Sequence, residues 1–566
     1  MARILGLILA VSTAGANPKV DKIFERFDKP SSPGCSLAVM RDGQIVYKRA
    51  YGMANLDHDV VLKTSSVFHV ASVSKQFTAA SIVLLAQEGR LSLDDPVRKH
   101  IPELADFGAP LSIRHLVHHT SGLRDQWALL GLAGWRYSLD LITDDDVLEM
   151  ISRQKALNFK PGDKHLYSNT GYTLMAIIVK RVSGQSLREF TKARFFDPLG
   201  MRDTHFRDDH AEIVKGMAYG YVPAKDAFRL SNTQFDTAGA TSLLTTAEDM
   251  ALWDKNFYDA KAGGAALIAQ MTERGRLNDG ETLSYAFGLS HAKHKGLTVV
   301  EHGGSDAGYR AHFMRFPEQR FSVACLCNVA NANPSRLARE VADVYLPTEP
   351  AAPAQEQPTV SVSEEELKRY AGLYWNREDD QIRRFDFKDG KLRLLLPGNS
   401  IPLEAIAQDR FRSDNFPFEF RFEPSRVVEE AGSAKPTDYE RAVEFVPSLR
   451  DYAGVYYSDE VDLPFHLVIQ KEALVLKRLK SRPATLEPTV KDAFAGGPGN
   501  FRFLRDPRGR VSGFIYSSGR IRNMKFTRRL STHVGLPIIS QGIFEEGYPP
   551  VGSGLGAGWG RSRNHS

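Results

Sequence analysis

A repeated motif in the last third of the sequence divides this 566-residue chain. The pattern Leu-x-x-Tyr-Ala-Gly-x-Tyr begins at Leu367 and again at Leu449, 82 residues later, and a Phe-Arg-Phe triplet follows each copy at nearly the same spacing, at Phe420 and Phe501. Each copy has short alternating segments between Gly or Pro turns, which indicates strands. A repeat of this length is one folding unit used twice. We therefore predict two small antiparallel β-barrel-like domains, at residues 364–446 and 447–530.

The segments around these copies differ in composition. Residues 347–363 carry four prolines and few apolar side chains, as expected of a linker. Residues 531–566 are rich in Gly and Ser without periodicity, which predicts a disordered tail. Residues 1–16 combine Arg3, a short apolar run and an Ala-Gly-Ala end, the parts of a secretory signal peptide. We expect a periplasmic or secreted protein; a frayed first helix in a cytoplasmic protein is the alternative.

Residues 17–346 mix strand and helix patterns. Residues 35–52 alternate around Asp42-Gly43, a hairpin turn signal. Two more strand patterns lie near the other end of the segment, at 297–304 and 321–330, with helical patterns between. This order predicts an α+β fold, a mostly antiparallel sheet sandwiched by helices.

Composition excludes several classes of protein. A net charge of +5 without a basic run does not indicate nucleic-acid binding, and no later stretch is apolar enough for a membrane span. Three cysteines are too few for a disulfide-stapled fold, and Cys325 and Cys327, on one face of a strand, read as small buried residues. We see no metal-ligand cluster and no Gly-rich phosphate loop, so we expect no metal and no cofactor. We interpret His118 and His119 as packing residues.

Ser72 and Lys75 open a long apolar helical run near residues 72–89. Ser-x-x-Lys is a weak pattern, since it recurs at 152–155 and 290–293. Only the first copy begins a helix that looks buried, and burial lowers the pKa of a lysine. A neutral amine beside a hydroxyl is one way to activate a serine nucleophile.

Two further patterns point to chemistry. Tyr167-Ser168-Asn169 lies between a Pro-Gly turn and a helical run, so Tyr167 and Asn169 belong to a loop that enters a helix. His302-Gly303-Gly304-Ser305 follows a strand, where glycines let a backbone approach a ligand closely.

Together, Ser-x-x-Lys, Tyr-x-Asn and His-Gly-Gly resemble the serine β-lactamase and penicillin-binding superfamily, in its class C-like branch. The resemblance covers about residues 20–345 and implies a catalytic domain at 17–346. The two added β-domains resemble the architecture of D-aminopeptidases, in which a loop from a barrel can restrict the active site.

The resemblance also implies roles for the motif residues. Ser72 is the expected nucleophile, and Lys75 and Tyr167 the expected proton carriers, with the base left open between them. Asn169, His302 and Gly304 are expected to bind or admit the substrate. The backbone N–H groups of Ser72 and Ser305 are the expected oxyanion hole.

The third motif departs from the Lys-Thr-Gly of class C β-lactamases, because His302 replaces the permanent charge. We therefore expect a serine hydrolase that acts on a D-amino-acid peptide, as a D-aminopeptidase or D,D-carboxypeptidase does, or on a small ester. A class C-like β-lactamase is the first alternative. A non-catalytic penicillin-recognition sensor is the second, and β-repeats that bind an apolar ligand are the third. The partner is a small molecule or peptide, and the oligomeric state stays open.

Overall fold

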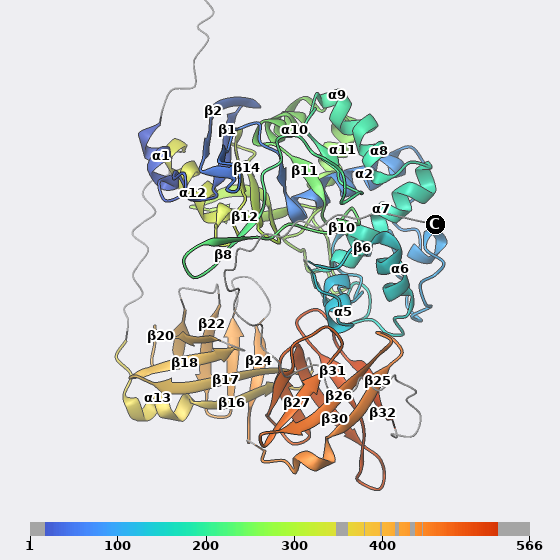
Figure 1. The fold of residues 1–566 in the computed structure, drawn as a ribbon, viewed down its shortest axis with the longest axis vertical. Coiled ribbons are helices and arrows are strands. Elements are labelled where there is room, and N and C mark those ends of the chain that lie inside the picture. Colours follow the sequence, from blue (N-terminus) through green and yellow to red (C-terminus); the bar gives the residue numbers. More distant parts are fainter. Residues whose placement is uncertain are drawn as a thin grey trace, which may run out of the picture. The chain divides into compact units, whose positions relative to one another are not determined.

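The computed structural model describes residues 17–529 except 138, 347–359, 379, 397–398, 414–417, 431–435 and 444 (Figure 1). The predicted signal peptide, most of the predicted linker and the predicted tail lie outside the described residues. No helix in the described part of the chain has the length and apolar content needed to span a bilayer.

A six-stranded antiparallel sheet forms the centre of the first domain. Its strands, in spatial order, are β12 (Ser290–His294), β13 (Leu297–Asp306), β14 (Tyr309–Phe316), β15 (Phe321–Cys327), β1 (Cys35–Arg41) and β2 (Gln44–Tyr51). Asp42 and Gly43 join β1 to β2 with φ values of 53° and 70°, the left-handed conformation that a tight hairpin turn requires. The predicted hairpin is therefore present.

Helices cover both faces of this sheet (Figure 1). Helices α1 (Pro18–Phe24) and α12 (Pro334–Tyr345) contact each other, and α12 packs on β14 and β15, while α10 (Ala247–Asp259) packs on β1 and β15 from the other face. Alternate residues of β1 enter two different cores: Leu37 and Val39 join one, Ala38 and Met40 the other. The predicted fold class, a mostly antiparallel sheet between helices, is confirmed.

Most of the remaining helices of this domain lie between β5 and β12 in the chain. They are α2 (Lys75–Gln87), α3 (Val97–His100), α4 (Ile113–Val117), α5 (Gln126–Leu132), α6 (Asp144–Ser152), α7 (Asn169–Ser183), α8 (Leu187–Thr191), α9 (Asp197–Leu199) and α11 (Gly264–Met271). The short strands are β3 (Met53–Asn55), β4 (Val60–Val61), β5 (Phe68–His69), β6 (Ile142–Thr143), β7 (His205–Phe206), β8 (Tyr221–Pro223), β9 (Phe228–Leu230), β10 (Phe235–Asp236) and β11 (Leu243–Thr245).

The cysteine prediction needs correction. Cys325 and Cys327 do share one face of β15 and are not bonded to each other, as expected. However, Cys327 forms a disulfide with Cys35, which lies opposite it on β1. The pairing joins residues 292 positions apart. It depends on the register between two distant strands, which the spacing of cysteines along the chain does not reveal.

The first repeat forms a nine-stranded antiparallel sheet preceded by α13 (Glu364–Tyr370). Its strands are β16 (Gly372–Asn376), β17 (Gln381–Lys388), β18 (Lys391–Leu396), β19 (Asn399–Pro402), β20 (Glu404–Ala405), β21 (Arg410–Arg412), β22 (Glu419–Glu423), β23 (Arg426–Glu430) and β24 (Thr437–Ala442). The second repeat closes into a barrel of β25 (Gly454–Ser458), β26 (Leu463–Gln470), β27 (Ala473–Lys477), β28 (Ala484–Pro488), β29 (Ala493–Gly496), β30 (Gly499–Arg505), β31 (Val511–Ser517) and β32 (Met524–Arg529).

The shared motif forms the same bond in both copies. The hydroxyl of Tyr374 donates to the carbonyl of Tyr370 at 3.0 Å, and that of Tyr456 donates to the carbonyl of Tyr452 at 2.8 Å. In each copy the last phenylalanine of Phe-Arg-Phe packs on the first tyrosine, with ring centroids 4.7 and 4.8 Å apart. The repeated sequence motif therefore forms the same tertiary contacts in both domains.

Aromatic side chains fill the interior of the second barrel. The ring of Phe514 lies 4.7 Å from that of Phe526, 5.3 Å from Phe501 and 5.0 Å from Tyr456, and all four are buried. Small eight-stranded barrels are commonly packed in this way. This packing argues against the alternative in which this repeat encloses an apolar ligand.

Candidate functional site

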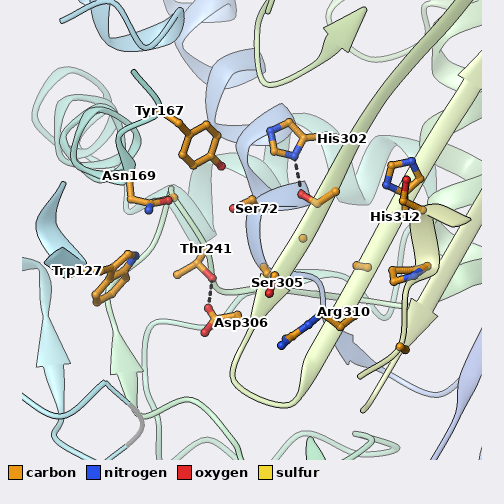
Figure 2. A pocket seen from close by; sticks show the side chains of 18 of the residues that line it. Ser72, Trp127, Tyr167, Asn169, Thr241, His302, Ser305, Asp306, Arg310 and His312 are labelled. Atoms are coloured by element: carbon orange, nitrogen blue, oxygen red, sulfur yellow. Dashed lines mark hydrogen bonds between the residues drawn. The ribbon is translucent and has the colours of Figure 1, made fainter. Parts of the chain in front are cut away.

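Ser72 lies in a single 3₁₀ turn, Ala71–Ser74, directly before α2. The sequence predicted an α-helix from residue 72, but the regular helix begins at Lys75. Helix α2 is buried along most of its length, so its apolar sequence is explained by packing on all sides. Ser72 lines a cavity of about 730 Å³ together with Tyr167, Asn169 and His302 (Figure 2).

The amine of Lys75 is held by three acceptors. Its Nζ lies 3.1 Å from Ser72 Oγ, 2.9 Å from Asn169 Oδ1 and 2.6 Å from the carbonyl oxygen of Ala240. A charged amine satisfies all three with its three N–H groups. A neutral amine keeps the two stronger acceptors and turns its lone pair toward Ser72.

Burial makes the neutral form of Lys75 accessible. The loss of solvation lowers its pKa to about 7, an effect that nearby Asp125 opposes and the positive charge of Arg520 reinforces. An amine with a pKa near neutrality can accept a proton from a hydroxyl that it already contacts. The predicted pairing of a serine with a buried lysine is therefore present in the structure.

Asn169 is fixed from two sides at the first residue of α7. Its backbone N–H and its side-chain Nδ2 both donate to Asp125 Oδ2, each at 2.8 Å. Its Oδ1 is thereby turned toward Lys75. Asp125 orients the amide, and the sequence analysis did not identify it.

Tyr167 precedes α7, and Figure 2 shows its hydroxyl directed toward Ser72. Its ring packs on His119 with centroids 4.2 Å apart. Burial raises the pKa of Tyr167, while its hydrogen bond with Ser72 acts in the other direction. The phenol is therefore neutral near pH 7.

The third motif lies on β13, where the neighbouring strand ends. β12 pairs with β13 only as far as Glu301, so the β13 edge from His302 to Asp306 is left unpaired on that side. A methyl group added to Gly304 would come within 2.2 Å of the carbonyl oxygen of Val70. Glycine is therefore required for β13 to approach the turn that carries Ser72, and Ser305 lines the same cavity.

His302 is a neutral imidazole with a defined tautomer. Its Nδ1 lies 2.6 Å from the carbonyl oxygen of Gly303, which only accepts, so Nδ1 carries the proton (Figure 2). Its Nε2 then accepts from the hydroxyl of Tyr285 at 3.0 Å. Burial lowers the pKa of His302 to about 3.

Six of the seven predicted site residues line one cavity. The seventh, Lys75, contacts Ser72 from directly beneath the cavity. It adds residues that no sequence motif singled out: Asp125, Tyr285, Arg310 and Arg520. His119, predicted to be a packing residue, does pack, and its Nδ1 also accepts from the backbone N–H of Ser168 at 3.2 Å.

Two clusters in the described residues have the ligand spacing of a metal site. One is Cys35, Cys325 and Cys327, of which two are joined as a disulfide. The other is Asp209, His210 and Asp236. None of these residues lines the cavity beside Ser72.

Comparison with known proteins agrees with this geometry. The beta-lactamase family model matches residues 20–346. A D-aminopeptidase from Gluconobacter oxydans is 27% identical over 439 residues, covering 76% of this chain and 80% of the relative. A penicillin-binding protein from Bacillus subtilis is 31% identical over 322 residues, covering 54% of this chain and 70% of the relative. The solved structure of an octameric penicillin-binding protein homologue from Pyrococcus abyssi superposes with a TM-score of 0.54 at 27% identity, covering 75% of this chain and 99% of that one.

Proposed function

As a member of the beta-lactamase family this chain is a serine hydrolase, and we propose that it cleaves peptides or amides containing a D-amino acid through an acyl-enzyme on Ser72. The observation that carries the proposal is the contact between Ser72 Oγ and a lysine whose pKa burial lowers to about 7. The likeness to a D-aminopeptidase over 439 residues supports the substrate class, because it extends beyond the family match.

In the acylation step, Ser72 Oγ attacks the carbonyl carbon of the substrate while its proton passes to Lys75 Nζ. The lowered pKa of Lys75 favours the lysine as base over Tyr167, whose pKa is raised. The negative charge on the substrate oxygen is stabilised by the N–H groups of Ser72 and Ser305. One such donor typically contributes about 3 kcal/mol to the transition state.

The tetrahedral intermediate then collapses. The bond from carbon to the leaving nitrogen breaks, and that nitrogen takes a proton from the Tyr167 hydroxyl, which is replaced by the proton held on Lys75. The carbonyl carbon remains bonded to Ser72. In deacylation a water molecule attacks that carbon, its proton passes through the same groups, and Ser72 is released as a hydroxyl.

Asn169 and β13 position the substrate in this scheme. The Nδ2 group of Asn169 has a second hydrogen beyond the one given to Asp125, which can bind a substrate carbonyl. The unpaired edge of β13 at 302–306 can hydrogen-bond an extended peptide as an added strand. His302 supports this edge as a neutral side chain.

The β-lactamase alternative is less well supported by the site. The third motif carries a neutral imidazole, whose pKa is lowered to about 3, in the place of the permanently charged lysine of the class C β-lactamase motif. This leaves D-aminopeptidase, D,D-carboxypeptidase and esterase activities as the finer possibilities within the proposal.

Initial rates on four substrates test the proposed function. They are D-alanine p-nitroanilide, its L-isomer, a short-chain p-nitrophenyl ester and a chromogenic cephalosporin, each given to the protein and to Ser72→Ala. We expect a preference for the D-anilide over the L-anilide that is lost in the variant. Fastest turnover of the cephalosporin would instead indicate a β-lactamase.

Mass spectrometry of the intact protein separates an enzyme from a sensor. A Ser72 adduct that forms and decays, with product released, supports hydrolysis. A stable adduct without product release would contradict it and indicate the non-catalytic penicillin-recognition protein.

Export from the cytoplasm belongs to this proposal. The buried Cys35–Cys327 disulfide supports a periplasmic or secreted location, because disulfides persist in oxidising compartments. Cell fractionation of the expressed full-length chain tests it, and recovery of the protein only with cytoplasmic markers would contradict it.

A further inference from the structure

One wall of the cavity beside Ser72 comes from the C-terminal barrel. Arg520 lies in the loop 518–523 between β31 and β32, yet it lines the same cavity as Ser72 and Tyr167. Its guanidinium carbon lies 5.1 Å from the centroid of the Tyr167 ring. A cation is therefore placed over the side chain that points at the nucleophile.

The backbone of this loop is fixed on both sides of Arg520. Asn158 Nδ2 donates to the carbonyl of Arg520 at 3.1 Å, and Asn158 Oδ1 accepts from the N–H of Arg522 at 2.8 Å. Arg124 Nη2 donates to the carbonyl of Arg522 at 3.0 Å. These bonds hold the loop in the conformation that points Arg520 into the cavity.

The charge of Arg520 is only weakly engaged. In the described part of the chain, its side chain contacts one carboxylate, at 3.5 Å to Asp125 Oδ2. That oxygen already accepts two bonds from Asn169 at 2.8 Å. The Arg520 side chain is 45% exposed, so most of its five N–H donors are open to a ligand.

A second arginine lines the same cavity. Arg310 Nη1 donates to the carbonyls of Ala307 and Tyr309, and no carboxylate in the described residues lies within 4.0 Å of its guanidinium. Figure 2 shows Arg310 on the β14 side of Ser305.

Among the described residues that line the cavity, the one carboxylate already has hydrogen-bond donors. Asp306 is 4% exposed and accepts from the Tyr137 hydroxyl at 2.6 Å and from Thr241 Oγ1 at 2.7 Å (Figure 2). The charges that a ligand can reach are therefore those of the two arginines. An anionic group on a ligand would be attracted here.

We propose that the substrate carries a carboxylate that Arg520 binds, with Arg310 as a second anion contact, so that the barrel loop sets the specificity of the hydrolase. The inference rests on the proposed function and narrows it to anionic D-amino-acid peptides. The carboxylate is either the free C-terminus of the peptide or an acidic side chain.

Three peptides whose N-terminus is acetylated, and therefore uncharged, distinguish a C-terminal from a side-chain carboxylate. They are N-acetyl-D-alanyl-D-alanine, its C-terminal amide, and N-acetyl-D-glutamyl-D-alanine amide. The first has a C-terminal carboxylate, the third a side-chain carboxylate, and the second neither. We expect kcat/KM for one of the two acids to exceed that of the neutral amide by about 10- to 100-fold, the range of a charge-assisted hydrogen bond.

Variants of Arg520 test the assignment. Arg520→Gln should remove that preference, mainly through KM and beyond any loss shared by all three peptides, and Arg520→Lys should restore part of it. Arg508→Gln, in the exposed turn between β30 and β31, is the matched control and should keep the preference. An equal loss by Arg520→Gln on all three peptides would assign it a structural role, and a wild-type preference for the neutral amide would overturn the proposal.

Failure of the proposed function can be told apart from failure of this inference. Turnover of D-alanine p-nitroanilide that depends on Ser72, without any preference for the acids, contradicts only the anion site. If no substrate is turned over, calorimetric titration of Ser72→Ala with the two acids and the neutral amide tests whether the anion site exists. Tighter binding of an acid that Arg520→Gln abolishes would support the site, and equal or absent binding would overturn it.

Discussion

Arg124 and Glu460 form a buried ion pair that joins the catalytic domain to the C-terminal barrel. Their side chains are 0% and 8% exposed, and Nη1 of Arg124 lies 2.5 Å from Oε2 of Glu460. The same Nη1 donates to Gln154 at 2.9 Å, and the same oxygen accepts from the N–H of Lys155 at 2.9 Å. Both partners of the ion pair thus also form hydrogen bonds with residues of the catalytic domain.

Replacing Glu460 by Gln should destabilise the protein by about 3–5 kcal/mol, because it leaves the Arg124 guanidinium buried without its counter-charge. Denaturant unfolding measures this. Lys155→Gln, which breaks an exposed pair with Asp459, should cost less than about 1 kcal/mol. Equal effects of the two variants would show that the buried pair contributes no more than a surface one.

The rate should rise with pH through about 7. Lys75 is a base only when neutral, and its pKa is lowered to about 7, so kcat/KM increases as the amine loses its proton. Lys75→Arg stays protonated and should lower kcat by about 10²–10⁴-fold. A flat profile from pH 5 to 9 in the wild-type protein would contradict a lysine base.

The lowered pKa of Lys75 also predicts that the stability of the protein depends on pH. The pKa of Lys75 is about 7 when folded and 10.5 in the reference state, so between these values the unfolded chain binds the proton that the folded one has lost. The free energy of unfolding contributed by Lys75 therefore rises with pH across this window and is least favourable below pH 7. Urea titrations at pH 6 and 9 on the wild type and on Lys75→Met isolate this contribution; the difference between the two proteins should depend on pH.

Tyr167→Phe should lower kcat by about 10²–10⁴-fold with little change in KM, since it removes only the hydroxyl directed at Ser72. The ring contacts with His119 and Arg520 remain. Tyr172→Phe is a suitable control: its hydroxyl donates to the carbonyl of Val117 at 2.9 Å, so the variant should lose about 1 kcal/mol of stability and keep its rate. A fully active Tyr167→Phe would remove the phenol from the mechanism.

Replacing each of the two glycines of the third motif by alanine should have very different effects on kcat. Gly304→Ala places a methyl group 2.2 Å from the Val70 carbonyl and displaces β13 from Ser72, which should cost about 10²–10³ in kcat, as for a lost oxyanion donor. Gly303→Ala meets His312 Nδ1 at 3.4 Å and the carbonyl oxygen of Ala311 at 3.8 Å, both ordinary contact distances, and should keep most of the activity. Steady-state kinetics on both variants gives the comparison, and similar losses would show that the approach of β13 to Val70 is not what Gly304 provides.

Loss of the disulfide should lower stability by about 2–5 kcal/mol, because Cys35 and Cys327 close a long loop of the unfolded chain. Thermal unfolding of Cys327→Ser, compared with wild type under non-reducing conditions, measures it. Cys325→Ala alters the free buried thiol on the same strand and should cost much less. If both variants unfold alike, the bridge is not stabilising.

The local parts of this structure were predictable from sequence. The hairpin at Asp42-Gly43, the strand at His302 and the Ser72–Lys75 spacing depend on residues close together in the chain. The repeated tyrosine motif was recognisable because two copies occur. In each case the physical constraint, a turn conformation or a helix face, acts within a few residues.

Contacts between distant segments were not predictable. Cys327 meets Cys35 only because β15 pairs with β1 in one register. Asp125 belongs to none of the sequence motifs, and only the fold brings it beside Asn169. Arg520 belongs to a domain that no motif connects to Ser72, and it enters the cavity through a loop held by Asn158. Tertiary packing decides these positions, and a single sequence does not encode them in a visible spacing.

The position of Arg520 in the chain has a consequence for the order of assembly on the ribosome. Ser72, the proposed nucleophile, is made early, but the central sheet is completed only after β15 is made, and Arg520 is the last of the described cavity residues to be made. Domains generally fold as they emerge during synthesis. The nascent catalytic domain therefore folds with its Ser72 turn formed and its cavity open on one side, and the enclosed, arginine-lined pocket exists only once the second barrel has folded and docked.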